Sequence, residues 1–168
     1  MNKNTLFLLI KIAAVGILIF IAMLYYALRT KVNDISSEKP FNSILNQKLT
    51  TKRIAYLVKN RSPEVYENQY LLLENKDDID SELKEVYQIS IGTNLTIHKA
   101  KIFTNGTSGF SHLYVLGSIY AEDLKKEVSF EYNYGEKKYS LYSNEEEYWS
   151  FDKAIWENEK IVGKFYFN

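Results

Sequence analysis

Two histidines, His98 and His112, carry the side chains of this sequence best suited to acid–base catalysis or to metal binding. Either role needs a carboxylate, a hydroxyl or a second histidine close by. If the chain reverses near Thr107, the flanking strands place His98 and His112 about 13 Å out of register. We therefore expect two unrelated histidines on strands, with no metal site and no cofactor.

The turn-rich segment 105–109 offers Ser108 as a nucleophile, but no histidine lies next to it in the sequence to activate it. None of the common catalytic motifs occurs in the chain. We therefore expect a protein that is not an enzyme. The alternative is a membrane-surface enzyme of unrecognised type, for example a hydrolase that uses Ser108.

Two acidic runs, at residues 77–80 and 145–147, contain the side chains that bind divalent cations. The first run lacks the central glycine and the terminal glutamate of a calcium loop. Acidic residues at the positive end of a helix dipole explain both runs more simply. The sequence thus predicts helix starts at these positions.

A row of tyrosines near the C-terminal end of the chain is the candidate binding surface: Tyr132, Tyr134, Tyr139 and Tyr142. Tyrosine gives a large contact area at low entropic cost. Apolar and polar residues alternate from Val128 onward, which predicts a strand whose other face is solvated through Ser129, Glu131 and Asn133. The alternative is that the tyrosines pack within the sheet.

Residues 5–28 are almost entirely apolar and contain Lys11 as their single charge. As a helix they span about 36 Å, enough to cross the hydrocarbon core of a bilayer. Aromatic and basic residues follow as an interfacial collar: Tyr25, Tyr26, Arg29 and Lys31. Bulky aromatics also replace the small residues of a cleavage site, so we expect an uncleaved signal anchor in contact with the lipid bilayer.

The remaining composition says little about partners. Lys and Arg number 21 and so do Asp and Glu, and the tyrosines lie among mixed charges, so we expect no nucleic-acid binding. The chain has no cysteine, which leaves both oxidising and reducing compartments open. Basic residues on the two sides of the apolar segment nearly balance, with a slight bias that places the domain outside the cell membrane.

We expect three parts: a membrane anchor at 1–29, a polar linker at 30–42 and one soluble domain at 43–168. Periodicity predicts a weak helical segment at 43–58, helices at 63–75, 77–87 and 145–155, and strands at 95–102, 113–121, 128–134, 139–142 and 161–167. A turn at 135–138 is expected to join the strands 128–134 and 139–142 into a hairpin. The predicted fold is α+β, with two or three helices packed on a four- to five-stranded antiparallel sheet.

An anchored small domain of this kind suits a membrane-tethered, single-pass binding or adaptor protein that acts on another envelope or membrane protein. Assembly factors and toxin-neutralising proteins share this arrangement, and both roles agree with the expectation.

Overall fold

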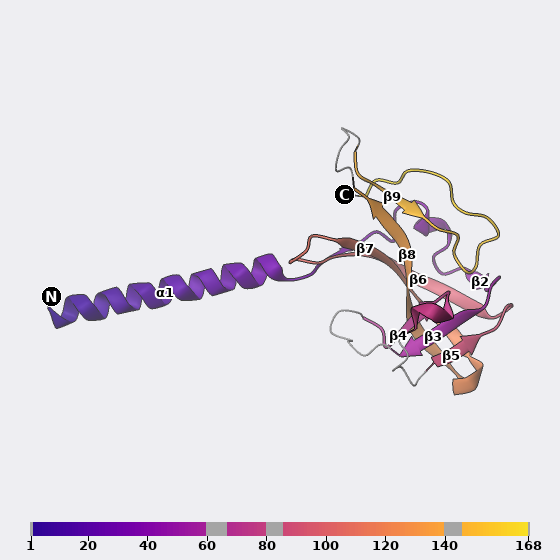
Figure 1. Ribbon diagram of the computed structural model, residues 1–168, viewed down its shortest axis with the longest axis horizontal. Helices are drawn as coiled ribbons and strands as arrows, with labels where there is room; N and C mark the ends of the chain where they lie inside the picture. The colour runs from indigo at the N-terminus through magenta and orange to yellow at the C-terminus, as the bar shows by residue number, and fades with distance from the viewer. Residues whose placement is uncertain (1, 60–66, 80–85, 140–145, 168) are drawn as a thin grey trace. The chain divides into compact units, whose positions relative to one another are not determined.

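The computed structural model describes residues 2–59, 67–79, 86–139 and 146–167 (Figure 1). The chain divides into two compact units. The first contains the residues up to 31 together with 104–110, and the second contains 32–103 together with 111 onward.

The first unit is built on helix α1 (Lys3–Leu28), a helix of 26 residues and therefore about 39 Å long. It is long and apolar enough to cross a membrane, as a membrane anchor or a signal sequence would be. The Arg29 guanidinium lies 4.5 Å from the centre of the Tyr26 ring, in the aromatic and basic collar. The predicted apolar helix is thus confirmed.

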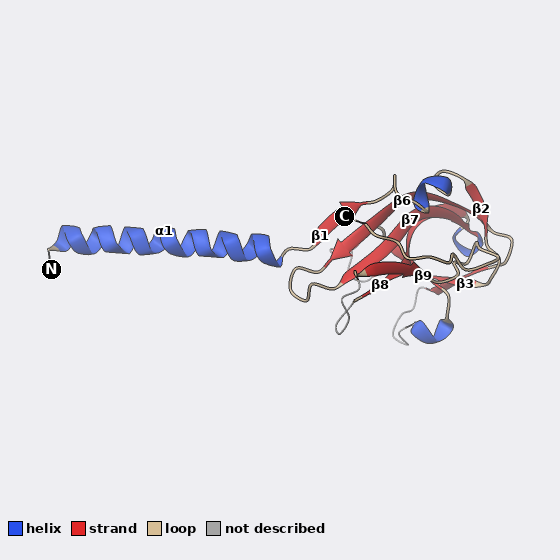
Figure 2. Cartoon of the chain, turned by 90° about the horizontal axis from the view of Figure 1, so that it is seen from above, coloured by secondary structure: helices blue, strands red, loops and turns tan. Residues whose placement is uncertain are grey.

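The second unit is a mixed sheet of nine strands (Figures 1 and 2). Its strands are β1 (Lys31–Asp34), β2 (Lys48–Thr50), β3 (Ala55–Lys59), β4 (Tyr70–Leu73), β5 (Val86–Ile89), β6 (Asn94–Thr104), β7 (Ser111–Ala121), β8 (Lys126–Lys138) and β9 (Tyr148–Phe151). The order is β1-β6-β7-β8-β4-β3-β5, with β2 also paired to β6 and β9 to β8. Three short 3-10 helices, η1 (Phe41–Ser43), η2 (Lys76–Asp78) and η3 (Glu122–Leu124), complete the described elements.

The predicted α+β fold is wrong, because no helix packs on the sheet in the part of the chain that the structure describes, and the sheet has nine strands. Within the predicted helix 63–75, strand β4 buries Tyr70 and Leu72 and pairs in parallel with β8. Within the predicted helix 145–155, strand β9 buries Trp149 and Phe151 with the same two-residue period.

Two other segments that were predicted as helical also contain strands. The segment 43–58 contains β2 and most of β3, and the described residues of the segment 77–87 include the end of η2 and the start of β5. Residues 63–66, 80–85 and 145 lie outside the described residues. Short apolar runs fit a helix and a strand about equally well, and here long-range strand pairing decides between them.

The predicted hairpin around residues 105–109 is confirmed, since β6 and β7 flank it. The burial pattern of β6 also changes phase at His98 and Lys99, which are both exposed. By contrast, the predicted turn at 135–138 is wrong. Strand β8 runs straight through it and pairs with β9, and Gly135 leaves room for the Phe151 ring, which would lie 2.9 Å from a Cβ at that position.

The core lies on one face of the sheet and joins residues from β3 to β9 into one apolar cluster. Segments from both ends of the domain close it. The ring of Phe41 lies 5.6 Å from that of Phe151 and 5.9 Å from that of Phe167. Ile35 and Phe41 are both buried, so the segment 30–42, expected as a linker, carries strand β1 and two core side chains.

Candidate functional site

Tyr132 and Tyr134 point into the core and are only 5% and 3% exposed. Their rings lie 5.1 and 5.4 Å from the ring of Trp156. Their hydroxyls donate to Glu74 and Glu157 respectively. Burial is the main cause that raises the pKa of each tyrosine, and the hydrogen-bonded carboxylate adds to it. These two tyrosines therefore pack within the sheet, which was the alternative to a binding surface.

Tyr139 and Tyr142 complete the predicted row. Tyr139 is half-buried, its hydroxyl accepts the N–H of Ser111 at 3.0 Å, and the Lys137 ammonium lies 5.0 Å from the centre of its ring. Tyr142 lies outside the described residues. The structure thus brings Tyr132 and Tyr134 together in the core and leaves Tyr139 as a half-buried residue after β8.

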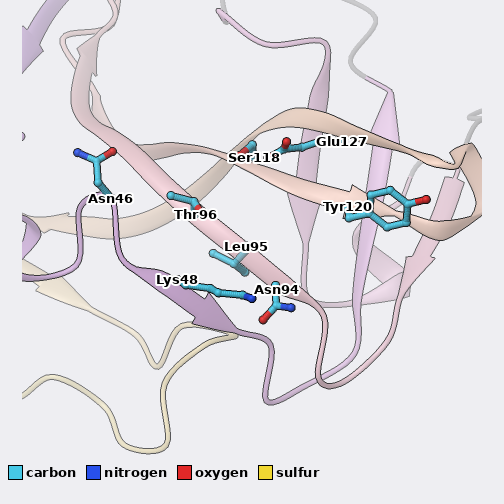
Figure 3. Close-up of a pocket in the computed structure, with 8 residues that line it drawn as sticks. All are labelled: Asn46, Lys48, Asn94, Leu95, Thr96, Ser118, Tyr120 and Glu127. Carbon is cyan, nitrogen blue, oxygen red and sulfur yellow. The ribbon is translucent and has the colours of Figure 1, made fainter.

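An open pocket lies on the other face of the sheet, where strands β2, β6, β7 and β8 come together (Figure 3). Its volume is about 340 Å³, within the range of small ligand sites. It is lined by Asn46, Lys48, Asn94, Leu95, Thr96, Ser118, Tyr120 and Glu127.

Strand geometry explains how these residues meet. Gly117, Ile119 and Ala121 of β7 face the core, so Ser118 and Tyr120 face the pocket. Tyr120 and Glu127 are direct partners across β7 and β8, and Lys48 and Thr96 are partners across β2 and β6. The pocket therefore presents hydroxyl and amide groups together with one ammonium and one carboxylate.

His98 lies beside the pocket and bridges two of the residues that line it. Its Nε2 is 3.0 Å from the Ser118 Oγ, and its Nδ1 is 3.4 Å from the Asn46 Oδ1. When Nδ1 carries the proton, Nδ1 donates a hydrogen bond to the Asn46 Oδ1, and Nε2 accepts one from the Ser118 hydroxyl. Nucleophilic hydrolases combine a hydroxyl, an imidazole and a carboxylate, or a thiol, an imidazole and an amide, so this set shares their nucleophile–imidazole pair and has an amide in place of the carboxylate.

Asn46 is held in place by its backbone. It adopts a φ of +57°, a left-handed conformation that asparagine tolerates better than most residues. Its N–H donates to the Ile97 carbonyl at 2.8 Å, which fixes the turn before β2 against β6. The sequence indicated His98 as a candidate, but nothing in the local pattern pointed to Asn46 or Ser118.

The other candidate catalytic residues lie elsewhere. His112 is exposed at the start of β7, six residues and therefore about 20 Å along the strand from Ser118. Ser108 belongs to the tip of the β6–β7 hairpin, where its Oγ accepts the N–H of Phe110 at 3.3 Å. The two histidines are thus separate, as their spacing predicts.

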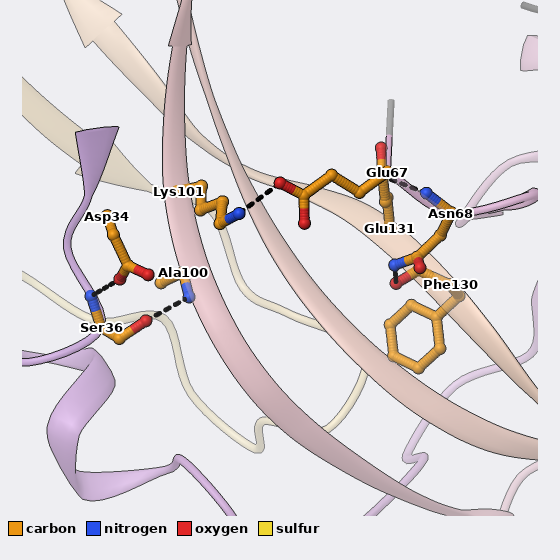
Figure 4. A network of polar contacts seen from close by, with 8 residues as sticks. All are labelled: Asp34, Ser36, Glu67, Asn68, Ala100, Lys101, Phe130 and Glu131. Carbon is orange, nitrogen blue, oxygen red and sulfur yellow. Dashed lines mark hydrogen bonds and ion pairs between the residues drawn. The ribbon is translucent and has the colours of Figure 1, made fainter. Parts of the chain in front are cut away.

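Glu131 corrects one further expectation, because its side chain is 0% exposed on the face of β8 that was expected to be solvated (Figure 4). Its Oε1 accepts the N–H of Asn68 at 2.8 Å, and the Asn68 side chain donates to the Phe130 carbonyl at 3.0 Å. Lys101 and Glu67 form an ion pair nearby. Residues just before β4 therefore cover this part of the sheet.

The second oxygen of Glu131, Oε2, is buried and has no hydrogen-bond partner among the described residues. Burial is the largest effect on this carboxyl group and raises its pKa above the ordinary value of 4.5, although hydrogen bonds from Asn68 and Glu67 act in the opposite direction. A buried carboxyl oxygen without a hydrogen bond is unfavourable for the folded state.

Comparisons with protein-family models, with curated proteins and with solved structures find no match for this chain. The geometry of the pocket is therefore the basis for a functional proposal.

Proposed function

We propose that this chain is a membrane-tethered, non-enzymatic binding domain that acts on another membrane or envelope protein through the pocket beside His98. Helix α1 holds the protein in the cell membrane as a single-pass anchor, and the slight charge bias of its flanks places the domain on the extracytoplasmic side. Confinement to the bilayer raises the effective concentration of any partner in the same membrane, so a modest interface is sufficient.

The pocket is the observation that supports this proposal. Its lining offers hydrogen-bond donors and acceptors along neighbouring strands, with Lys48 and Glu127 adding one charge of each sign. Such a lining fits a polar, extended stretch of polypeptide better than an apolar small molecule. Tyr120, which is half exposed, supplies the aromatic contact area that interfaces favour.

Site-specific crosslinking in native membranes tests the proposal. A p-benzoylphenylalanine at Tyr120 places the photoreactive group in the pocket, and the same residue at Val162, which is 93% exposed, serves as the control. We expect a discrete adduct with a membrane or envelope protein from position 120 and none from position 162. The double substitution Lys48→Ala and Ser118→Ala is expected to weaken capture roughly tenfold.

Equal adducts from both positions, or none from position 120, would contradict the proposal. The circular dichroism spectrum of each variant in detergent separates lost binding from lost folding, since the substituted side chains lie outside the core cluster.

A membrane-surface hydrolase is the second candidate, and the contacts of His98 with Ser118 and Asn46 are the observation that favours it. A fluorophosphonate probe reacts with an activated serine hydroxyl. Labelling that disappears in both Ser118→Ala and His98→Gln would support the hydrolase. If the parent chain is labelled no more strongly than the Ser118→Ala variant, the hydrolase is contradicted and the binding domain is favoured.

A further inference from the structure

The tip of the β6–β7 hairpin, residues 104–110, belongs to the same compact unit as helix α1. Gly106 shows how closely the two segments approach. A Cβ at this position would lie 2.5 Å from the backbone of Leu28 and from the carbonyl oxygen of Arg29, closer than any side chain permits. Glycine therefore lets the backbone of the tip lie directly against the C-terminal end of the helix.

That end of the helix carries the residues that mark a membrane–water interface. Tyr25 and Tyr26 are exposed, and Arg29 stacks on the Tyr26 ring. Aromatic rings sit at the level of the lipid headgroups in membrane proteins, and arginine side chains extend from there toward water. A segment in contact with Leu28 and Arg29 lies at the same depth.

The composition of the tip suits this depth. Residues 104–110, Thr-Asn-Gly-Thr-Ser-Gly-Phe, carry no charge, and Phe110 is 58% exposed. An exposed phenylalanine gains free energy when it leaves water for the boundary between headgroups and acyl chains. No charge has to be desolvated when this tip enters the interface.

The backbone of the tip is also prepared for a less polar surrounding. The Asn105 Oδ1 accepts the N–H groups of Thr107 and Ser108 at 2.8 and 2.9 Å. The Asn105 carbonyl accepts the N–H of Gly109 at 2.8 Å, and the Asn105 N–H donates to the Phe110 carbonyl at 2.9 Å. Backbone groups that are already paired lose little when water is removed, whereas unpaired ones are costly in lipid.

We propose that residues 104–110 form a second membrane contact, in which the hairpin tip rests on the end of α1 and Phe110 enters the phospholipid interface. This inference rests on the proposed anchoring of α1 in the membrane and adds a lipid-binding element to it. The partner is the bilayer that holds the helix.

The absence of cysteine from the chain allows a direct test by electron paramagnetic resonance. Single nitroxide labels at Thr107→Cys, Ile17→Cys and Val162→Cys are placed in the full chain, in vesicles of phosphatidylcholine and phosphatidylglycerol. Power saturation with oxygen, which partitions into lipid, and with a water-soluble nickel chelate then gives the depth of each label. We expect the label at 17 in lipid, that at 162 in water and that at 107 at the interface, shielded from nickel.

Phe110→Ser and Ile91→Ser form a matched pair in the Thr107→Cys background, because both residues are exposed apolar side chains in loops. We expect Phe110→Ser to move the label at 107 toward water and Ile91→Ser to leave it unchanged. A label at 107 as accessible to nickel as that at 162, while the label at 17 stays in lipid, would overturn the inference alone. A label at 17 that is accessible to nickel would overturn the anchor itself.

Discussion

The carboxyl group of Glu131 is buried, and one of its two oxygens has no hydrogen-bond partner among the described residues. Because its pKa is raised in the folded protein, the folded state binds a proton more readily than the unfolded chain does. Between pH 4.5 and the raised folded value, the folded state therefore holds more protons. The contribution of Glu131 to stability is fully present below pH 4.5 and is lost as pH rises through the folded pKa.

The substitution Glu131→Gln removes this titration and keeps an oxygen for the Asn68 N–H. We expect the variant to gain stability relative to the parent chain, on the order of 1 kcal/mol, as pH rises from 4.5 to about pH 8. Urea unfolding of the full chain in non-ionic detergent at several pH values measures the difference. Glu127→Gln, at an exposed position on the same strand, is the control and should follow the parent chain. Identical pH curves for the parent chain and Glu131→Gln would refute the argument.

For single residues, the sequence predicted which side chains share a face of a strand better than it predicted which of them are buried. Phe130, Tyr132 and Tyr134 do share one face, as their spacing indicates. The burial of Glu131 depends on Asn68, which lies 63 positions earlier in the chain. Likewise, Asn46 reaches His98 only because the three-residue strand β2 pairs with β6. A local pattern contains no information about either contact.

At the scale of elements, the segment 30–47 contributes more to the domain than its polar composition suggests. Phe41 is fully buried and its ring contacts those of Tyr134, Phe151 and Phe167. The sequence shows a single phenylalanine beside a proline and gives no period by which a core position can be recognised. Strands β4, β5 and β9 have only four residues each, so their short apolar runs predicted helices where long-range pairing forms a sheet.

Phe41→Ala should lower the free energy of unfolding by about 3–5 kcal/mol, because it removes a large buried ring and leaves a cavity. Val32→Ala, at an exposed position of β1 in the same segment, should change it by less than about 0.5 kcal/mol. Chemical denaturation of the full chain in detergent compares the two. Similar small effects would show that the segment 30–42 acts as a linker after all.

At the scale of the whole molecule, strand β8 connects the two parts of the sheet. It pairs with β7 along one edge and with β4 and β9 along the other. Phe165 and Phe167 pack against the core on this sheet, and the Phe167 ring contacts that of Phe41, so a late segment of the domain meets an early one. Most stabilising contacts therefore join segments that are far apart in the sequence.

A chain that ends at Lys160 should lose about 3 kcal/mol or more of stability, because it lacks Phe165 and Phe167 and exposes Phe41 and Phe151. Thermal unfolding in detergent, followed by near-ultraviolet circular dichroism, measures the loss. Val162→Ala should have almost no effect, since this side chain lies outside the packing. A truncated chain as stable as the parent would contradict the proposed role of these residues.

The packing of the Phe41 ring against the Phe167 ring also determines when the domain can fold during synthesis. Helix α1 is synthesised before either ring, and more than a hundred residues separate the two rings along the chain. Residues so far apart in the sequence come into contact late in folding, and their apolar surface stays exposed until then. On the ribosome, the two rings can pack together only after Phe167 leaves the exit tunnel, so the apolar surface around Phe41 must be protected from other chains until then.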